Sequence, residues 1–508
     1  MKIFSSENIR NIDRATIQEG TSAMELIHRV AEGVVKEIVQ RFGTSKPIVV
    51  FAGPGNNGAD ALIVAKLLIE AGYSPEIYLF NIKGNSLSRD CREAYGELMT
   101  LPSVKMTEII DTARIPELSP AHLVVDGLFG TGLRDSLEGG FKMLARYISE
   151  KGATVYSIDI PSGLFCDWNQ GNLSRDMVHA TMTFAVQYPR LSFFLRDNAD
   201  IVGQWKLLDI GLSKTAAAAT PTKYYYVECA EVADVLKHRK PFSSKSDFGT
   251  ALIYSGCYGM MGAAVMAARG ALRAGVGKLT VHSGRCGFDI LQSQVPEALF
   301  EPDPKDILIS DMSPRHNYDA ICAGPGIGVN DATRGALKSL IMNVRNPLVL
   351  DADALNIIAK EPSLLNHLAP GTILTPHAGE FDRIFGQHTS AEARLIRATE
   401  VSHKYKVNIV MKGHYTAVVR HDGNVFFNST GSPAMATPGS GDVLAGVITA
   451  LLAQGYKPGT AAVAGVYIHG LAGEMAAEIH GEYGTTAIDI AENVGRAIAS
   501  ILKTKKII

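Results

Sequence analysis

The feature that most restricts the fold of this chain is an alternation of short apolar runs with longer helical patterns. Runs such as PIVVFAG, LVVDGLFG and TVYSIDIPSG have the length and β-branched content of buried strands. The stretch ADALIVAKLLIEAG, which follows the first run, has the apolar spacing of a helix. Because parallel strands need a crossover connection, usually a helix, this alternation predicts an α/β fold with parallel sheets.

The alternation is interrupted once, between two long α/β halves. The segment SKTAAAATPTK is small, polar and without apolar periodicity, and the alternation resumes after it with TALIYSG and KLTVHSG. A chain of 508 residues is too long for one ordinary core. We predict domains at residues 1–212 and 224–508, the second being larger, with a linker at 213–223. Residues 6–39 are expected to form one or two amphipathic helices that cover an edge of the first sheet.

Composition narrows the class of ligand. Lys and Arg number 49 against 51 Asp and Glu, and no basic block is present that could neutralise a run of nucleic-acid phosphates. The six cysteines form no CxxC pair, so neither a zinc site nor a dense disulfide framework is expected. The N-terminus lacks the apolar core of a signal peptide, and no apolar run approaches about 20 residues. We therefore expect a soluble, cytoplasmic protein that acts on a small molecule, with neither nucleic acid nor membrane as a partner.

Three loops of the first half carry polar groups at strand ends. The motif FAGPGNNGADAL passes from a strand through a glycine-rich turn into a helix, whose free N–H groups favour an anion. VVDGLFGTGLRDS places Asp126 at a second strand end, and IDIPSG places Asp159 and Ser162 at a third. These loops should converge on one pocket, where the polar groups could hold a monovalent cation and leave one carboxylate for proton transfer. Acidic strand ends with a purely structural role are the alternative.

The three motifs, in this order, resemble the N-terminal domain of NAD(P)H-hydrate epimerases, which has a Rossmann-like three-layer fold. The resemblance covers most of residues 1–212 and implies a potassium site at Asn57, Asp126 and Ser162. We assign proton handling to Asp159. The chain departs from the family at Ala59 and Ala61, where glycine is usual, and at Phe141, where an aromatic hydroxyl is common. The resemblance implies hydrate contacts at Asn56, Asn57, Gly58, Ala59, Asp60, Gly130, Thr131, Gly132, Leu133, Arg134, Asp135, Ser136 and Asp159.

In the second half, the motif MATPGSGDVLAG has the pattern of a phosphate cradle on a helix N-terminus. Gly439 and Gly441 flank Ser440, so successive N–H groups can point at one oxyanion. Asp442 is then placed to take a proton from a hydroxyl, although a plain helix N-cap is the alternative. The motif MKGHYT sets Lys412 at another strand end, where a basic residue followed by a glycine and a hydroxyl suits nucleotide phosphates.

Three more loops are expected to complete this cleft. CAGPGIG supplies glycines that permit close approach of a ligand, and LDADAL supplies Asp351 and Asp353, which could hold magnesium through water. ILTPHAGE supplies His377 and Glu380. A lone histidine is usually structural, so a satisfied turn histidine is the alternative for His377.

This second set of motifs resembles the NAD(P)H-hydrate dehydratase domain, a member of the ribokinase-like superfamily, over roughly residues 225–508. The resemblance implies ADP, or ATP, and Mg²⁺ as cofactors beside the K⁺ of the first domain. Hydrate contacts are implied at Ala263, Gly326, Gly328, His377 and Asp442. ADP contacts are implied at Lys412, Gly413, His414, Tyr415, Thr416 and Gly441.

Two such domains in this order resemble the bifunctional bacterial repair enzymes. The implied function is interconversion of the R and S hydrates of NADH and NADPH, followed by ADP-dependent dehydration of the S form to NAD(P)H, AMP and phosphate. The resemblance also implies a homo-oligomer, a tetramer or larger. The rival hypothesis is a ribokinase-like small-molecule kinase fused to a non-catalytic Rossmann-like binding module, since a GSGD loop alone suits either reaction.

Overall fold

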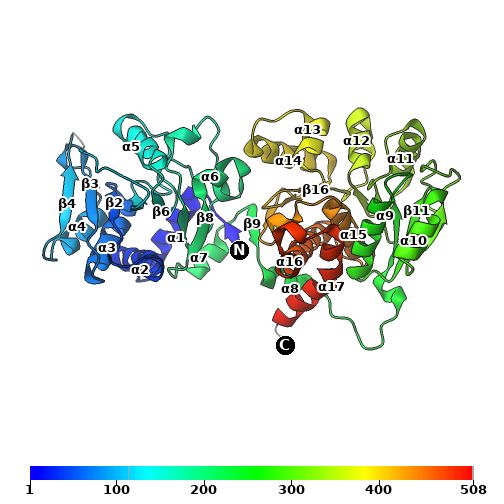
Figure 1. The fold of residues 1–508 in the computed structure, drawn as a ribbon, viewed down its shortest axis with the longest axis horizontal. Helices are drawn as coiled ribbons and strands as arrows, with labels where there is room; N and C mark the ends of the chain where they lie inside the picture. The colour runs from blue at the N-terminus through cyan, green and yellow to red at the C-terminus, as the bar shows by residue number, and fades with distance from the viewer. Residues whose placement is uncertain (112–113, 506–508) are drawn as a thin grey trace. The chain divides into compact units, whose positions relative to one another are not determined.

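The computed structural model describes residues 1–111 and 114–505, and the chain divides into two compact units (Figure 1). One comprises Lys2–Thr222, and the other comprises Lys223–Ile508 together with Met1. The segment predicted as a linker belongs to the first unit as far as Thr222. It carries a short helix, α7 (Lys214–Ala219), because the Ser213 hydroxyl caps the Ala216 N–H at 3.1 Å and the Ala217 methyl is buried. A run of alanines flanked by a capping serine favours this helix despite its lack of periodicity.

The first unit is built on a seven-stranded sheet in the order β4-β3-β2-β5-β6-β7-β8. Every neighbouring pair is parallel. Chain order therefore reverses between β2 and β5, which is the switch point at which ligands bind in such sheets. The strands are β2 (Ile48–Ala52), β3 (Glu76–Phe80), β4 (Lys105–Ile109), β5 (Leu123–Gly127), β6 (Thr154–Ile158), β7 (Met182–Val186) and β8 (Gln204–Leu208); a short β1 (Lys2–Ile3) precedes them.

Helices cover both faces of this sheet. Val50 and Val125 point to the face on which α2, α3 and α4 pack, whereas Val49 and Val124 point to the face covered by α5. The alternation along each strand thus gives two apolar layers, and the Rossmann-like three-layer prediction is confirmed. The helices are α1 (Ser6–Gln18), α2 (Ala23–Arg41), α3 (Asn56–Glu70), α4 (Arg89–Leu98), α5 (Gly139–Glu150) and α6 (Ala199–Val202).

The second unit contains a larger mixed sheet, with the order β9-β18-β17-β16-β15-β14-β13-β10-β11-β12. Its strands pair in parallel from β12 to β16, and β16, β17 and β18 form an antiparallel meander. The strands are β9 (Tyr224–Val227), β10 (Thr250–Tyr254), β11 (Lys278–Ser283), β12 (Leu299–Pro302), β13 (Ala320–Ala323), β14 (Leu348–Leu350), β15 (Ile373–Leu374), β16 (Asn408–Met411), β17 (Ala417–Val419) and β18 (Val425–Asn428).

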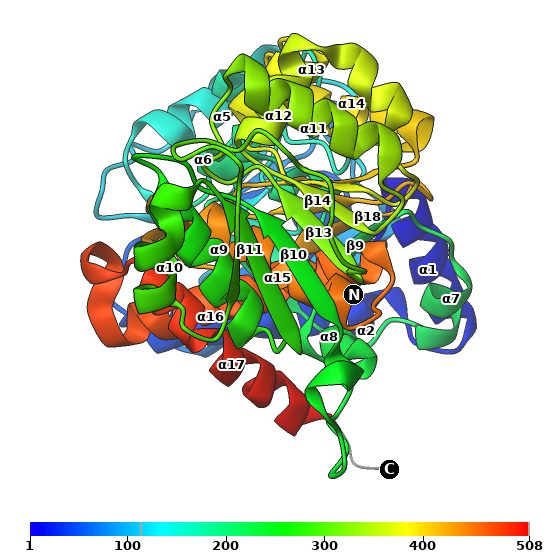
Figure 2. The same ribbon diagram turned by 90° about the vertical axis from the view of Figure 1, so that its right-hand side faces the viewer.

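Two helical layers enclose this sheet (Figure 2). The helices α11 to α14 lie above it in that view, and α15, α16 and α17 lie below, where they share one apolar core with α8 and α9. This arrangement confirms the predicted α/β class. The helices are α8 (Cys229–Val235), α9 (Met261–Arg273), α10 (Phe288–Gln294), α11 (Asp331–Asn343), α12 (Asp353–Lys360), α13 (Ala378–Phe385), α14 (Ala391–Tyr405), α15 (Ser440–Ala453), α16 (Pro458–Gly484) and α17 (Ala487–Thr504).

The helices α9 and α15 pack backbone against backbone. A methyl group at Gly446 would lie 2.0 Å from the Ala267 carbonyl oxygen, and one at Gly270 would lie 2.4 Å from the Val443 carbonyl oxygen. Glycine at these two positions therefore permits the close approach.

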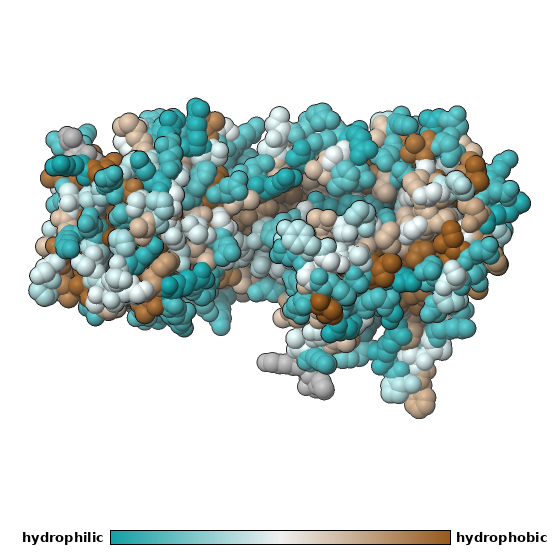
Figure 3. Space-filling view, viewed as in Figure 1, coloured by the Kyte–Doolittle hydropathy of each residue, from teal (hydrophilic) through white to brown (hydrophobic). Residues whose placement is uncertain are grey.

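The surface in Figure 3 is largely hydrophilic, with apolar side chains in scattered groups. Within the described part of the chain, no helix has the length and apolar character required to cross a bilayer.

Candidate functional sites

A pocket of about 700 Å³ opens in the first unit at the carboxyl ends of β2, β5 and β6. It lies at the switch point of the sheet, where the three glycine-containing loops were predicted to meet. The lining includes these predicted hydrate-binding residues: Asn56, Asn57, Asp60, Gly130, Thr131, Gly132, Leu133, Arg134, Asp135 and Asp159.

Asp159 is held rigidly at the floor of this pocket. Its backbone has a φ of 67°, a conformation that costs free energy for a residue other than glycine. One carboxylate oxygen accepts a hydrogen bond from the Thr131 N–H at 2.8 Å, and the other pairs with the Arg190 guanidinium. Arg190 is itself buried and donates to the Tyr188 carbonyl at 2.7 Å, so the carboxylate has one fixed orientation.

Two further aspartates face the same pocket. Burial raises the pKa of Asp13, on α1, to about 6, with Arg190 lowering it and Asp159 raising it. Burial raises the pKa of Asp60 well above its ordinary value, and the charges of Asp159 and Asp13 add to the effect. One pocket therefore holds two carboxyl groups whose pKa values burial raises, and that of Asp13 lies near neutrality.

Asp13 and Arg190 were not predicted from the sequence. Asp13 belongs to a helix that precedes the first strand of the sheet, and Arg190 follows β7 in the segment YPRLSFF. Neither position has a glycine-rich turn or a characteristic spacing beside it, so only the folded sheet brings these residues to the loops after β2 and β5.

Of the predicted potassium ligands, Asn57 lines the pocket, whereas Asp126 and Ser162 are fully buried, and all three have the chemistry that a cation requires. The Asp126 carboxylate is fully buried and accepts hydrogen bonds from the Ser157 hydroxyl at 2.8 Å, the Ser162 hydroxyl at 2.6 Å and the Ser162 N–H at 2.9 Å. Both polar atoms of the Asn57 carboxamide are buried without a hydrogen-bond partner in the described structure. An orphaned amide near a buried carboxylate fits a bound monovalent cation, since buried polar groups rarely lack partners.

Several predicted contacts do not line the pocket. Gly58 and Ala59 are buried beneath the turn, where a methyl on Gly58 would lie 1.8 Å from the Gly53 carbonyl oxygen. The Ser136 hydroxyl instead donates to the Asn172 side chain at 3.1 Å. Contacts of these three residues with a hydrate stay predictions, and in the described structure none of the three side chains or backbones lines the pocket.

The departures from the family pattern also lie outside the pocket lining. Ala59 and Ala61 belong to the apolar core between the sheet and α3. Phe141 packs edge-on against Phe129, with ring centroids 4.8 Å apart, and also contacts Phe80. The extra methyl groups therefore fill the core, and the phenyl ring acts on the pocket only through Phe129, which lines it.

In the second unit, the predicted residues gather around the Lys412 ammonium group. Lys412 follows β16, and its Nζ lies 2.9 Å from the Asp351 carboxylate, after β14, and 3.9 Å from that of Glu380. A methyl group on Gly441, at the start of α15, would lie 3.3 Å from the same Nζ. Four loops at the carboxyl ends of the sheet thus meet at one cation, and Asp351 and Glu380 raise the pKa of Lys412.

Asp442 lies in the first turn of α15, beside this cluster. Burial raises its pKa to about 7, and the negative charge of Asp351 raises it further while Lys412 lowers it. Among the described residues, no side chain caps the N-terminus of α15, whose N-cap position is Gly439; Asp442 therefore does not act as the N-cap. A carboxyl group with a pKa near neutrality is poised to accept a proton.

The glycine loop after β13 is joined to this cluster through Asp353, whose charge acts on Asp442. A methyl on Gly326 would lie 2.9 Å from the Ala263 side chain, which joins the loop after β13 to the start of α9. The Gly328 N–H donates to the Asp353 carboxylate at 2.9 Å. Between the two aspartates of LDADAL, Ala352 has a φ of 48°, so a strained residue sets the directions of Asp351 and Asp353.

His377 has a structural role that the sequence left open. Its Nδ1 accepts hydrogen bonds from the Gly379 N–H at 3.0 Å and the Glu380 N–H at 3.3 Å, which caps α13. The Lys412 N–H donates to the Pro376 carbonyl at 3.0 Å, so the His377 loop and the 412–416 turn run side by side. The cap leaves Nε2 of this half-exposed ring for a ligand and for Glu380, 3.5 Å away.

The turn predicted to contact ADP is closed by its own hydrogen bonds. The Thr416 hydroxyl donates to the Gly413 carbonyl at 2.9 Å, and the rings of His414 and Tyr415 are 4.4 Å apart. Gly413 and His414 are exposed, so their backbone can meet a nucleotide.

His469 was missed from the sequence. It is buried in α16 behind the phosphate-cradle loop, with Nε2 3.4 Å from the Ser440 hydroxyl. Burial lowers the pKa of this histidine to about 4, so a neutral ring supports Ser440. No group of three or more His, Cys, Asp or Glu side chains is arranged to hold a metal ion in residues 1–111 and 114–505.

Comparisons with known proteins agree with this two-site architecture. A family model described as NAD(P)H-hydrate dehydratase matches residues 251–496, and one described as YjeF-related protein N-terminus matches residues 23–192. The chain is 31% identical over 491 residues to the bifunctional NAD(P)H-hydrate repair enzyme Nnr of Moorella thermoacetica, covering 92% of this chain and 91% of the relative. The chain belongs to the bifunctional NAD(P)H-hydrate repair enzyme family.

Other members of the family are similar over the same extent. The enzyme of Coxiella burnetii is 30% identical, covering 92% of this chain and 93% of the relative, and that of Escherichia coli is 29% identical. Among solved structures, an ADP/ATP-dependent NAD(P)H-hydrate dehydratase from Bacillus subtilis, co-crystallised with ATP and Mg²⁺, is similar at 29% identity and a TM-score of 0.48. That match covers 55% of this chain and 98% of the other. The family predicted from the motifs is confirmed.

Proposed function

We propose that each unit carries one step of nicotinamide nucleotide repair. The first unit interconverts the R and S hydrates of NADH and NADPH, and the second dehydrates the S hydrate with ADP, giving NAD(P)H, AMP and phosphate. The observation that carries the proposal is the set of Asp442, Lys412 and Gly441 at the end of a ribokinase-like sheet, in a chain whose relatives are repair enzymes.

In the second unit, Asp442 is the proposed base. The hydrate hydroxyl gives its proton to the Asp442 carboxylate while its oxygen bonds to the β-phosphorus of ADP, and AMP leaves. The phosphorylated hydroxyl is a far better leaving group than hydroxide, so the C–O bond breaks and phosphate departs. The neighbouring ring carbon then gives up a proton to the departing phosphate, and the ring double bond returns. The N–H groups of the 439–441 loop and the Lys412 ammonium stabilise charge on the transferring phosphoryl group.

In the first unit, three aspartates that line one pocket suit inversion at the carbon that carries the hydroxyl. Asp159, which Arg190 and Thr131 hold in one orientation, is the proposed base, and Asp13, with a pKa of about 6, is a second group that can accept a proton. Asp60, whose pKa burial raises well above its ordinary value, is the proposed proton donor. Groups whose surroundings separate their pKa values in this way divide acid and base roles between them.

The two metal ions have separate proposed roles. Asn57, Asp126 and Ser162 would hold K⁺, whose charge offsets that of the buried Asp126 carboxylate and fixes the loops that bear Asn57 and Ser162. Mg²⁺ would be held mainly by nucleotide phosphates and by water, with Asp351 and Asp353 as outer partners, because Mg²⁺ commonly keeps several waters. The expected homo-oligomer can be checked by sedimentation.

Separated hydrate epimers test the division of labour. With ADP, Mg²⁺ and K⁺, the chain should restore the near-ultraviolet absorbance of reduced nicotinamide from both epimers. Asp159→Asn should consume the S hydrate at the wild-type rate but slow consumption of the R hydrate by about 10² or more. If wild type and Asp159→Asn consumed the R hydrate at equal rates, the epimerase role of the first unit would be wrong. If the S hydrate gave no recovery of absorbance with either ADP or ATP, the dehydratase role would be wrong and the kinase alternative would stand.

A further inference from the structure

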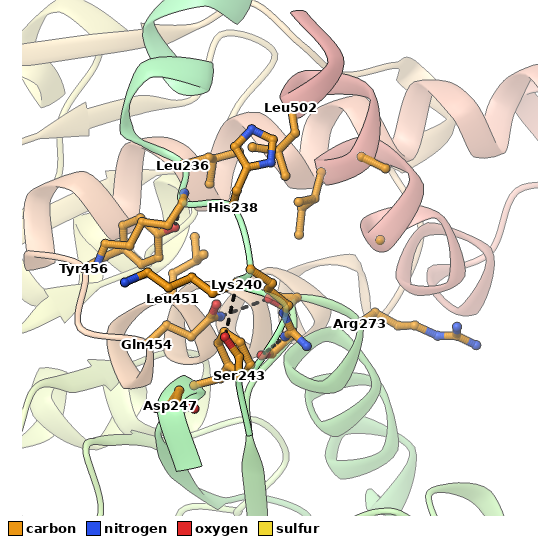
Figure 4. Close-up of a pocket in the computed structure, with 18 of the residues that line it drawn as sticks. Leu236, His238, Lys240, Ser243, Asp247, Arg273, Leu451, Gln454, Tyr456 and Leu502 are labelled. Atoms are coloured by element: carbon orange, nitrogen blue, oxygen red, sulfur yellow. Dashed lines mark hydrogen bonds between the residues drawn. The ribbon is translucent and has the colours of Figure 1, made fainter. Parts of the chain in front are cut away.

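The second unit holds another pocket, far from Asp442, with a volume of about 1090 Å³. It is lined by the last turn of α9 at Arg273, by Leu451 and Gln454 at the end of α15, and by the loop that follows α8 (Figure 4). The opposite ends of the same two helices carry Ala263 and Asp442. Since α9 and α15 have 13 and 14 residues, the pocket lies about 20 Å from the proposed dehydratase site.

Four consecutive cationic or ionisable residues line one wall of this pocket, Lys237, His238, Arg239 and Lys240. Asp247 is the one carboxylate in the lining, and its oxygen accepts hydrogen bonds from the Ser244 N–H and hydroxyl. In the described part of the chain, no carboxylate lies within ion-pair distance of those four residues. The whole chain has a net charge of −2, so this concentration of positive charge is local and not a reflection of composition.

The remaining surface of the pocket is apolar and aromatic. Leu272, Leu451 and Ile498 form the floor. Lys237 lies over the Tyr456 ring, with Nζ 4.8 Å from the ring centroid. The Phe242 ring, also in the lining, is fully exposed.

Helix capping explains only part of this arrangement. Cations favour the C-terminal ends of helices, and Arg239 does donate to the Gly275 carbonyl at 2.6 Å while Gln454 donates to that of Ala274 at 3.0 Å. The side chains of Lys237, His238 and Lys240 donate to no carbonyl in the described structure. A basic wall beside an apolar floor has the composition of a site for an amphipathic anion.

We propose that this pocket binds an organic polyphosphate, a molecule with several phosphate groups and a flat ring system. Its phosphates lie against Lys237, His238 and Lys240. Its ring lies on the apolar floor formed by the two leucines and Ile498, and Phe242 covers the ring. The inference does not depend on the reaction assigned to either unit, because none of these residues belongs to the proposed sites.

Hydrogen-exchange mass spectrometry on the full chain can locate such a ligand, with ATP and inorganic tripolyphosphate as probes. ATP should protect amides of residues 236–248 in addition to those of the 412–416 and 439–442 loops. His238→Glu combined with Lys240→Glu should remove the first protection, with the half-saturating ATP concentration rising at least about tenfold, and leave the other two unchanged. Lys404→Glu, an exposed charge reversal on α14, is the matched control and should change none of them.

Tripolyphosphate and Phe242→Ala test the two parts of the ligand. Tripolyphosphate should protect residues 236–248 more weakly than ATP does. Phe242→Ala should weaken the binding of ATP at this pocket and leave the binding of tripolyphosphate unchanged. Equal binding of both probes would overturn the claim of a ring subsite. No protection of residues 236–248 at millimolar ATP would overturn the site itself. A third outcome is that protection of residues 236–248 depends on protein concentration and not on ligand, and that an oligomer dissociates in the double variant. The pocket would then be an interface between copies of the chain, which would also overturn the proposal.

Discussion

Replacing Asp442 by Asn should abolish dehydration while making the fold more stable at alkaline pH. The carboxyl group is buried beside Asp351, and its pKa is raised from the ordinary 3.8 to about 7. Removing a general base typically slows a reaction by about 10² to 10⁴. In the wild type, the dehydration rate should fall about tenfold for each pH unit below about 7, because only the ionised carboxylate accepts the proton.

The effect on stability follows from the same pKa. A carboxyl group whose pKa is raised on folding contributes stability that is fully present below about pH 4 and lost as the pH rises through about 7. At 1.36 kcal/mol per pH unit, the loss has an upper limit of about 4 kcal/mol, and partial exposure of Asp442 reduces it to about 2 kcal/mol. Asp442→Asn avoids this loss, so its advantage over the wild type should grow from about pH 4 to about pH 7 and then stay constant.

Two measurements check the reasoning. The recovery of nicotinamide absorbance from the S hydrate with ADP, followed from about pH 5 to about pH 9, gives the rate profile. Urea unfolding at the same pH values gives the stability, with Asp331→Asn, at an exposed position of α11, as the matched control. A variant that retains more than about a tenth of wild-type activity, or a wild-type rate that is flat through pH 7, would refute Asp442 as the base.

Three further predictions concern the packing and the first unit. Gly446→Ala should destabilise the second unit by about 1–3 kcal/mol in urea unfolding, because its methyl would lie 2.0 Å from a carbonyl oxygen. The control, Gly335→Ala at an open position on α11, should be neutral or stabilising by up to about 1 kcal/mol. Equal effects of the two substitutions on stability would contradict the close packing of α9 and α15. Asn57→Ala should raise the K⁺ concentration needed for half-maximal epimerisation by about 10-fold to 100-fold at constant ionic strength, and an unchanged K⁺ requirement would exclude Asn57 as a ligand. Epimerisation should decline below about pH 6 as Asp13 becomes protonated; Asp13→Asn should lower the rate by about 10² and remove this dependence, and a persisting inflection would point to another group.

Local patterns of the sequence were enough to predict the layers and most of the loops in both sites. Parallel strands end at one edge of a sheet, so Asp159, Asp351 and Lys412 could be expected at ligand-binding edges from their place after apolar runs. Arg190 and His469 could not, because each is buried by packing between segments that are distant in sequence. A buried arginine or histidine has no periodic signature, and its partner is decided by the tertiary fold.

Asp159 and Ala352 both follow strands and both have a positive φ, and this strain affects how such an enzyme responds to selection for heat resistance. Glycine adopts the φ of 48° at position 352 without the strain that alanine suffers, and relief of such strain is worth about 1 kcal/mol or more. Glycine would also free the backbone between Asp351 and Asp353, whose carboxylates are the proposed outer partners of the Mg²⁺ ion. Screening for thermal tolerance alone would therefore favour variants at this loop that outlast the parent enzyme and turn over more slowly.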